Sequence, residues 1–133
     1  MTPALVLVVE DHPRNLKLVC HLLDYAGYRT VGAATAEDGI ELARSHRPDL
    51  VLMDVQLPGI DGVEALARLR AEPGAGDVPI VALAAFAMKD DRERFLAAGF
   101  DAYIEKPLDV REFPHHVAQI LGHHHEATAR ARR

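Results

Sequence analysis

The chain has 133 residues and a net charge of −5, and 49% of its residues are apolar while 26% are charged, which is typical of one soluble globular domain. The acidic balance offers no electrostatic basis for nucleic-acid binding, and Cys20 as the single cysteine excludes a disulfide framework. No apolar run reaches the roughly 18 residues of a membrane span, and the first one lacks the basic segment that begins a signal peptide, so we expect a cytoplasmic protein.

Five short segments, most of them apolar, are predicted to form strands. They cover residues 4–9, 29–32, 49–53, 80–83 and 102–104. Continuous apolar runs of this length are typical of strands that are buried on both faces of a parallel sheet. Because five helix candidates alternate with them, we expect a doubly wound α/β fold, in which helices cover both faces of a five-stranded parallel sheet.

Capping residues and apolar spacing locate the five helices. Pro13 suits a first helical turn, where no N–H donor is needed, and Gly27 marks the end of that helix. Thr35 begins a capping pattern with Asp38. The predicted buried residues, in helix order, are Leu16, Val19, Cys20 and Leu23; Ile40 and Ala43; Val63, Leu66 and Ala67; Met88, Phe95 and Leu96; and Phe113, Val117, Ile120 and Leu121. Gly122 marks the predicted end of a domain over residues 1–122, which leaves residues 123–133 as a flexible tail.

Polar side chains directly follow three of the apolar runs. Glu10 and Asp11 follow the first run, Asp54 follows the third, and Lys106 lies just beyond the fifth. In open α/β sheets the functional crevice lies beyond the carboxyl ends of the strands, so we expect these four side chains to converge. Three close carboxylates repel one another, and a divalent cation with oxygen ligands relieves that repulsion. A cation beside a carboxylate and an ammonium group suits the handling of a phosphoryl group.

Each of these features also has an ordinary structural explanation. An acidic pair after a strand commonly caps a helix or lies in a solvated turn, and turn residues follow Asp54. Lys106 is compatible with a solvated side chain, and Pro107 with a simple strand end. The order of these residues, at three separate strand ends, favours a shared site.

The chain resembles the receiver domain of two-component response regulators over residues 4–121. The resemblance rests on the segments VVEDHPRN, PDLVLMDVQLPGIDG and VPIVALAAFAMKDDRERFLAAGFDAYIEKP. The last of these is similar to the single-domain cell-cycle regulators called DivK-like. The resemblance implies a flavodoxin-like sheet with strand order 2-1-3-4-5, and a signalling protein rather than an enzyme.

The resemblance also implies a role for each residue at the strand ends. Asp54 would be the phosphoacceptor, whose carboxylate attacks a phosphoryl group carried by a histidine kinase, a histidine phosphotransfer protein or a small phosphodonor. Asp11, Asp54 and the backbone carbonyl of Gln56 would bind Mg²⁺, which Glu10 would reach through water. Lys106 would contact a phosphoryl oxygen.

The site has one departure from the usual receiver pattern, at Ala84, and Pro114 in the fifth predicted helix is a second departure. Receivers usually carry Thr or Ser at the end of the fourth strand, where the hydroxyl bonds the phosphoryl group, whereas this chain has Ala84. The aromatic partner in this switch is retained as Tyr103. The residues that influence the attacking water in receivers correspond to Gln56 and Phe86, and the apolar Phe86 predicts slow hydrolysis of a phosphorylated form.

Two prolines and several histidines complete the carboxyl-terminal region. We expect a cis peptide bond before Pro107, which would orient Lys106. Pro114 lies beyond the first turn if Asp109 is the N-cap, so it should cost a hydrogen bond or delay the helix start. The histidines at 115, 116 and 123–125 are interpreted as a solvated surface rather than a metal site.

Three functions are compatible with the sequence. The first is a phosphoryl-accepting module, with kinase docking near Leu18 on the first helix and a downstream protein on the face formed by the fourth helix, fifth strand and fifth helix. The second is an aspartate-nucleophile phosphatase, which would need a carboxylate where the chain has Gln56. The third is a phosphorylation-insensitive receiver-like adaptor, which Ala84 favours and which the intact set of Glu10, Asp11, Asp54 and Lys106 argues against. None of the three implies a nucleic-acid or membrane partner.

Overall fold

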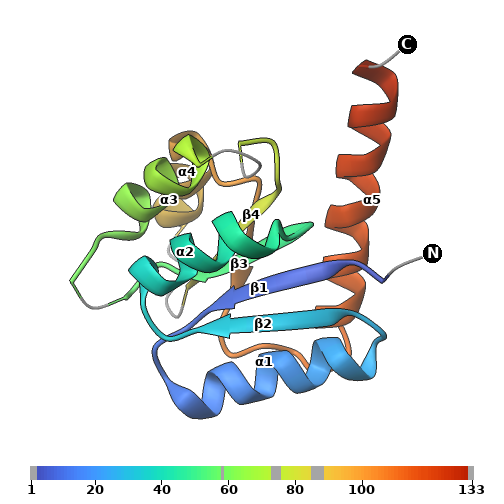
Figure 1. Ribbon diagram of the computed structural model, residues 1–133, viewed down its shortest axis with the longest axis horizontal. Coiled ribbons are helices and arrows are strands. Elements are labelled where there is room, and N and C mark those ends of the chain that lie inside the picture. The colour runs from blue at the N-terminus through green and yellow to red at the C-terminus, as the bar shows by residue number, and fades with distance from the viewer. Residues whose placement is uncertain (1–2, 58, 73–75, 85–88, 132–133) are drawn as a thin grey trace.

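A five-stranded parallel sheet forms the centre of the computed structural model, which describes residues 3–57, 59–72, 76–84 and 89–131 (Figure 1). The strands lie in the order β2-β1-β3-β4-β5. They are β1 (Leu5–Val9), β2 (Arg29–Ala33), β3 (Leu50–Asp54), β4 (Ile80–Ala84) and β5 (Ala102–Glu105). The helices are α1 (Pro13–Tyr25), α2 (Ala36–His46), α3 (Gly62–Ala71), α4 (Lys89–Ala98) and α5 (Phe113–Ala131). The predicted fold class and strand order are confirmed.

Helices cover both faces of the sheet, and each face has its own hydrophobic core. Because successive side chains of a strand point to opposite faces, β1 contributes Leu7 and Val9 to one core and Val6 and Val8 to the other. The first core packs against α2, α3 and α4, and the second against α1 and α5. Burial of each such side chain contributes about 1.5–3 kcal/mol. This two-sided burial explains why the sequences of the central strands β1, β3 and β4 are apolar without alternation.

The predicted starts of the first two helices are confirmed. Helix α1 begins at Pro13, with His12 as its N-cap residue. The hydroxyl of Thr35 accepts a hydrogen bond of 3.1 Å from the backbone N–H of Asp38. Gly27 follows α1 with a φ of 98°, which a residue without a Cβ adopts at little cost.

The predicted buried face of α3 is partly wrong. Leu66 is buried as expected, but Val63 and Ala67 are exposed, and Ala65 and Leu69 lie in the core instead. The sequence of α3 has apolar residues on several sides, so their spacing alone does not select one face. Packing against the sheet makes that selection.

Helix α4 buries fewer of its apolar side chains than the sequence predicts. Phe95 is buried and packs edge-on against Phe100, with ring centroids 5.9 Å apart. Leu96, which was predicted to be buried, is 39% exposed. Met88, the other apolar residue predicted for this face, lies outside the described residues.

Helix α5 begins later than Asp109 and ends later than the sequence predicts. Asp109 Oδ1 accepts hydrogen bonds from the backbone N–H groups of Arg111 and Glu112, and the helix begins later, with Pro114 as its second residue. The sequence also places Gly122 just beyond the end of this helix, which is wrong, because the helix continues to Ala131 and extends beyond the sheet (Figure 1). A glycine inside a helix costs only about 1 kcal/mol, which is too little to end it.

Although α5 has 19 residues, neither it nor another helix in the described ranges is long and apolar enough to cross a membrane.

Candidate functional site

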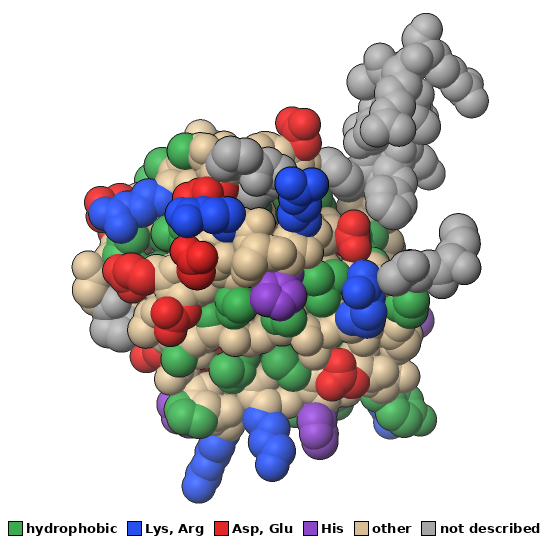
Figure 2. Space-filling view, viewed as in Figure 1, with side chains coloured by type: hydrophobic (Ala, Val, Ile, Leu, Met, Phe, Trp, Pro, Cys, Tyr) green, Lys and Arg blue, Asp and Glu red, His purple; other side chains and the backbone are tan. Residues whose placement is uncertain are grey.

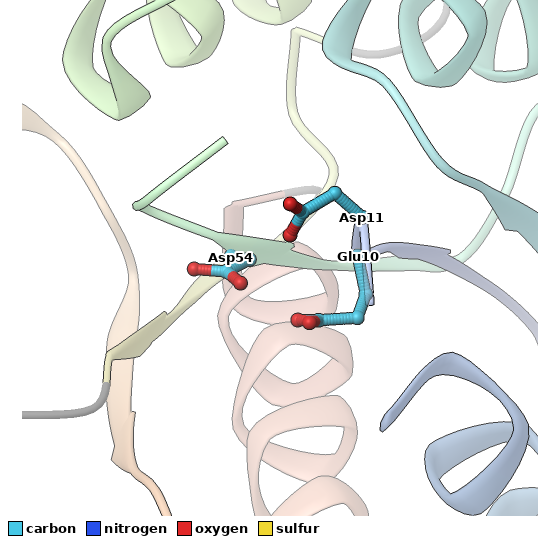
Figure 3. A group of neighbouring side chains, drawn as sticks. All are labelled: Glu10, Asp11 and Asp54. Carbon is cyan, nitrogen blue, oxygen red and sulfur yellow. The ribbon is translucent and has the colours of Figure 1, made fainter. Parts of the chain in front are cut away.

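Three carboxylates meet at the carboxyl ends of β1 and β3. The side chains of Glu10, Asp11 and Asp54 point toward one another (Figure 3), and their carboxylate oxygens lie within 4.8 Å of one another. Glu10 and Asp54 are 1% and 6% exposed, whereas Asp11 is exposed. The two strands are neighbours in the sheet, so their polar ends are forced together, as the sequence predicts.

Lys106 brings an ammonium group to this cluster from the end of β5. Its Nζ lies 2.7 Å from Glu10 Oε2 and 2.9 Å from Asp54 Oδ2. The backbone N–H of Lys106 donates a 2.8 Å hydrogen bond to the carbonyl oxygen of Ala84, which fixes the start of this loop against β4. The Lys106–Pro107 peptide bond is cis, as expected. The four residues predicted to converge are therefore in one place.

Further donors hold the two buried carboxylates. The backbone N–H of Gln56 donates to Asp54 Oδ1 at 2.8 Å. Glu10 Oε1 accepts from the backbone N–H of His12 at 3.3 Å and from Nδ2 of Asn15 at 3.4 Å. Asn15 was not recognised as a site residue from the sequence. The available signal was an amide donor in the first turn of a helix that begins just after an acidic pair.

The titration behaviour of the cluster follows from burial and from these contacts. Burial and the neighbouring Asp54 raise the pKa of Glu10. Burial alone would raise the pKa of Asp54, but contacts with Glu10, Lys106 and the Gln56 N–H outweigh it and lower that pKa below its ordinary value. Burial alone would lower the pKa of Lys106, but Glu10 and Asp54 outweigh it and raise that pKa. At neutral pH the site therefore contains an ionised Asp54 beside an ammonium group.

The two predicted switch positions lie beside this cluster. Ala84 ends β4, is 4% exposed and pairs with Glu105 in the sheet. The Tyr103 ring stacks on Phe95, with ring centroids 6.1 Å apart and an interplanar angle of 17°. The Tyr103 hydroxyl is buried and has no hydrogen-bond partner in the described part of the chain. Burial and the nearby carboxylates of Glu105 and Asp91 raise the Tyr103 pKa, so this phenol is neutral at physiological pH.

The two residues predicted to influence water have different outcomes. Gln56 is exposed, whereas Phe86 lies outside the described residues. A cavity of about 400 Å³ adjoins Gln56 on the α3 and α4 side and is bordered by Ala84, Asp91 and Phe95, among other residues. This cavity therefore lies next to Gln56 and Ala84, two of the positions singled out in the sequence.

The carboxylate cluster fits a hard divalent cation. Its donors are oxygen atoms, one of its side chains is open to solvent, and its geometry allows several oxygens to face one ion. Among residues whose side chains are described, Glu10, Asp11 and Asp54 form the one group of three close potential ligands. His115 and His116 are exposed and outside this group, and the side chains at 123–125 are outside the description.

Comparison with protein families identifies the same region as a known domain. The model of the response regulator receiver domain matches residues 6–118. The chain is 41% identical over 120 residues to the polar-differentiation response regulator DivK of Brucella anthropi, with 90% of this chain and 98% of that protein covered. The protein of the same name from Brucella ovis is 40% identical over 117 residues, with 88% and 95% of the two chains covered.

Solved structures agree with this fold. A CheY-like receiver domain protein of Methanospirillum hungatei JF-1 superimposes with a TM-score of 0.85 at 25% identity, covering 95% of this chain and 99% of that chain. The receiver domain of a sensor histidine kinase from Pseudomonas aeruginosa PAO1 has a TM-score of 0.82 at 35% identity, covering 91% and 99%. That structure has a magnesium ion coordinated in its active-site cleft. The chain therefore belongs to the response regulator receiver domain family of two-component signalling, and within it is DivK-like.

Proposed function

We propose that this response regulator accepts a phosphoryl group on Asp54 from a histidine kinase or a histidine phosphotransfer protein, and signals in the cytoplasm by protein–protein contact. The observation that carries the proposal is the ionised Asp54 carboxylate, which lies 2.9 Å from the Lys106 ammonium inside a cluster of carboxylates. A nucleophile needs an ionised oxygen, and the lowered Asp54 pKa provides it at neutral pH.

In the proposed step an Asp54 carboxylate oxygen forms a bond to phosphorus while the phosphorus–nitrogen bond to the donor imidazole breaks. The imidazole leaves with the bond's electron pair and retains a proton, so it departs as neutral histidine. Lys106 moves its ammonium contact from the carboxylate to a phosphoryl oxygen and stabilises the charge there. The Gln56 N–H continues to hold the acceptor residue in place.

Mg²⁺ is the proposed cofactor of this step. Asp11, Asp54 and the backbone carbonyl of Gln56 would hold it directly, and Glu10 would do so through water. When bound, the ion supplies positive charge that offsets the repulsion between the carboxylates and the charge of the incoming phosphoryl group. The exposed carboxylate of Asp11 keeps one side of the cluster accessible to the ion.

Catalytic turnover is not part of this proposal. An aspartate-nucleophile phosphatase would need a carboxylate two residues after its nucleophile, and this chain has Gln56 there. An amide can orient water but cannot accept its proton as a general base. We infer a phosphoprotein whose modified state persists long enough to be recognised by a partner.

Phosphotransfer is proposed to use the outer face of α1. Arg14, Lys17 and His21 are exposed there, and Leu18 is 43% exposed among them. Figure 2 shows basic and histidine side chains projecting from the edge of the molecule where α1 lies. An exposed leucine beside basic side chains suits a docking contact with a partner protein. Helix α1 begins next to the carboxylate cluster, so a kinase docked there would lie close to Asp54.

The downstream partner is proposed to bind the face formed by α4, β5 and α5. Arg92, Glu93 and Arg94 are exposed on α4, and the guanidinium of Arg94 lies 4.9 Å from the centroid of the Phe95 ring. The Tyr103 ring stacks on the same phenylalanine. On this face the charged side chains of α4 therefore lie next to the stacked rings of Phe95 and Tyr103.

A receiver-like adaptor that does not use phosphate is the second candidate. Ala84 provides no hydroxyl for a phosphoryl group, and the buried Tyr103 hydroxyl has no partner in the described residues. Both observations bear on how a signal would be transmitted from the site. Neither changes the carboxylate cluster that would accept the phosphoryl group. Chemical phosphorylation of the purified protein separates the two candidates.

The test is intact-protein mass spectrometry after incubation with acetyl phosphate, with Mg²⁺ or with EDTA. We expect one added phosphoryl group with Mg²⁺ and none with EDTA. The Asp54→Asn variant should lose this addition, whereas the matched variant Asp38→Asn, at an exposed position of α2, should retain it. Absence of labelling in the unmodified protein would support the adaptor, and equal labelling of Asp54→Asn would refute Asp54 as the acceptor.

A further inference from the structure

A second cavity lies at the corner between β5 and the start of α5. It has a volume of about 270 Å³ and is bordered by Tyr103, Lys106, Leu108 and Phe113, together with three acidic side chains discussed below. Pockets for whole small-molecule ligands usually span about 300–1,000 Å³. The size of this cavity is therefore better matched to a single side chain of a partner.

The rim of this cavity is acidic. Glu105, Asp109 and Glu112 contribute to the lining, are exposed, and form no ion pair within the described residues. Lys106 also borders the cavity, but its ammonium contacts Glu10 and Asp54 at the neighbouring site. The local surface therefore carries negative charge that the described side chains do not neutralise.

The arrangement of these acids does not suit a metal ion. Glu112 and His116 are one helical turn apart on α5 and both border the cavity. However, they are not among the described residues whose ligand atoms converge in a group of three. One carboxylate oxygen of Asp109 already accepts hydrogen bonds from two backbone N–H groups. Separated carboxylates around an apolar floor match an extended organic cation.

Tyr103 forms one wall of this cavity. Its ring packs inward, stacked on Phe95, and its buried hydroxyl has no partner in the part of the chain that the structure describes. Ala84 offers no side-chain acceptor. The inward position of Tyr103 is thus maintained by ring packing, which contributes independently of any group bound at Asp54.

We propose that this cavity binds an arginine side chain of a protein partner, and that it is open whether or not Asp54 is phosphorylated. A planar guanidinium can pair with two carboxylates and lie against an aromatic ring, which suits the acidic rim and the Tyr103 wall. Val110 is 53% exposed beside this rim and would be covered by the peptide chain that carries the arginine. The arginine would belong to the downstream partner that the proposed function places on the face formed by α4, β5 and α5. The inference rests on the proposed function only through that partner.

The test is a ¹⁵N–¹H NMR titration of the full chain with N-acetyl-arginine amide. We expect saturable shifts of the amides of Glu105, Glu112 and His116, with a dissociation constant on the order of millimolar for a probe of this size. N-acetyl-citrulline amide has nearly the same shape without the charge and should produce no such shifts. Equal shifts from both probes, or shifts spread over all surface carboxylates, would overturn the proposal.

Two matched variants locate the interaction. The double variant Glu105→Gln with Glu112→Gln should weaken binding by roughly tenfold, because two charge-assisted contacts are replaced by neutral ones. Glu37→Gln, at an exposed position of α2, should leave it unchanged. Unchanged binding by the double variant would overturn the assignment. Labelling of Asp54 by acetyl phosphate should be the same in both variants, so failure of this proposal is distinct from failure of the proposed function.

The same titration in the presence of beryllofluoride and Mg²⁺ tests whether the cavity is open in both states. We expect the dissociation constant to remain within about twofold, because Tyr103 already lies inward. A change of about tenfold or more would show that occupancy of the Asp54 site controls the cavity, which would refute the independence that we propose.

Discussion

Lys106 Nζ lies 2.9 Å from Asp54 Oδ2, although the two residues are 52 positions apart in the sequence. The same ammonium lies 2.7 Å from Glu10 Oε2, and the two carboxylate side chains are 8% and 2% exposed. A single cation thus offsets the repulsion between two buried acids. We therefore expect the stability of the protein to depend on whether a cation occupies the site.

Replacing Lys106 with Met should destabilise the protein most strongly in the absence of Mg²⁺. Removal of one partner from a buried ion pair leaves uncompensated charge, at a cost of roughly 3 kcal/mol. With Mg²⁺ present the loss should be smaller, since an ion that binds only the folded state stabilises it. Urea unfolding in EDTA and in saturating Mg²⁺ measures both values. Lys17→Met on the exposed face of α1 is the control, and an equal loss for Lys106→Met in both solutions would contradict the prediction.

Conformational coupling to the Tyr103 region should be weak in this chain and should increase in Ala84→Thr. A hydrogen bond to a charged group contributes about 1.5–3 kcal/mol, which corresponds to a roughly tenfold to hundredfold change in a two-state population. Amide NMR shifts near Tyr103 on addition of beryllofluoride should be small in the unmodified protein and larger in the variant. A response of equal size in both proteins would show that coupling does not need this hydroxyl.

The phosphorylated form should hydrolyse slowly, and Phe86→Glu should shorten its lifetime several-fold. The bulky apolar side chain at position 86 offers no polar group to orient water, whereas a carboxylate does. Loss of the phosphoryl group after removal of acetyl phosphate can be followed by intact-protein mass spectrometry. Phe86→Leu, which keeps the site apolar, is the matched control. A lifetime that is unchanged or longer in Phe86→Glu would show that this residue does not limit water access.

The two proposed docking surfaces should be separable by mutation. Leu18→Asp places a charge in the centre of the α1 face and should slow phosphotransfer from a kinase while sparing a downstream partner. Reversal of charge at Arg92 and Arg94 should have the opposite effect, because these exposed side chains of α4 lie on the other surface. Transfer kinetics and partner affinity are measured in parallel. If the α4 reversal blocked transfer and left partner binding intact, the assignment of the surfaces would be wrong.

Local sequence signals were sufficient for much of the architecture. The segments predicted as strands match each observed strand within one residue at either end. The signal was clearest for β1, β3 and β4, because a strand buried on both faces tolerates few polar residues. The Thr35 cap and the start of α1 at Pro13 depend on neighbouring residues alone, and both are present. The convergence of Glu10, Asp11 and Asp54 could also be predicted, since polar residues at the carboxyl ends of adjacent parallel strands share one edge.

Tertiary packing decided what these local signals left open. The face that α3 buries, with Ala65 and Leu69 instead of Val63 and Ala67, depends on the sheet below it, because small apolar residues fit either side of a helix. The continuation of α5 through Gly122 reflects a helix already anchored by Phe113 and Val117. The stacking of Tyr103 on Phe95 and the shared contacts of Lys106 join residues that are distant in sequence. Their geometry is set by strand order and helix packing, which no local pattern of residues contains.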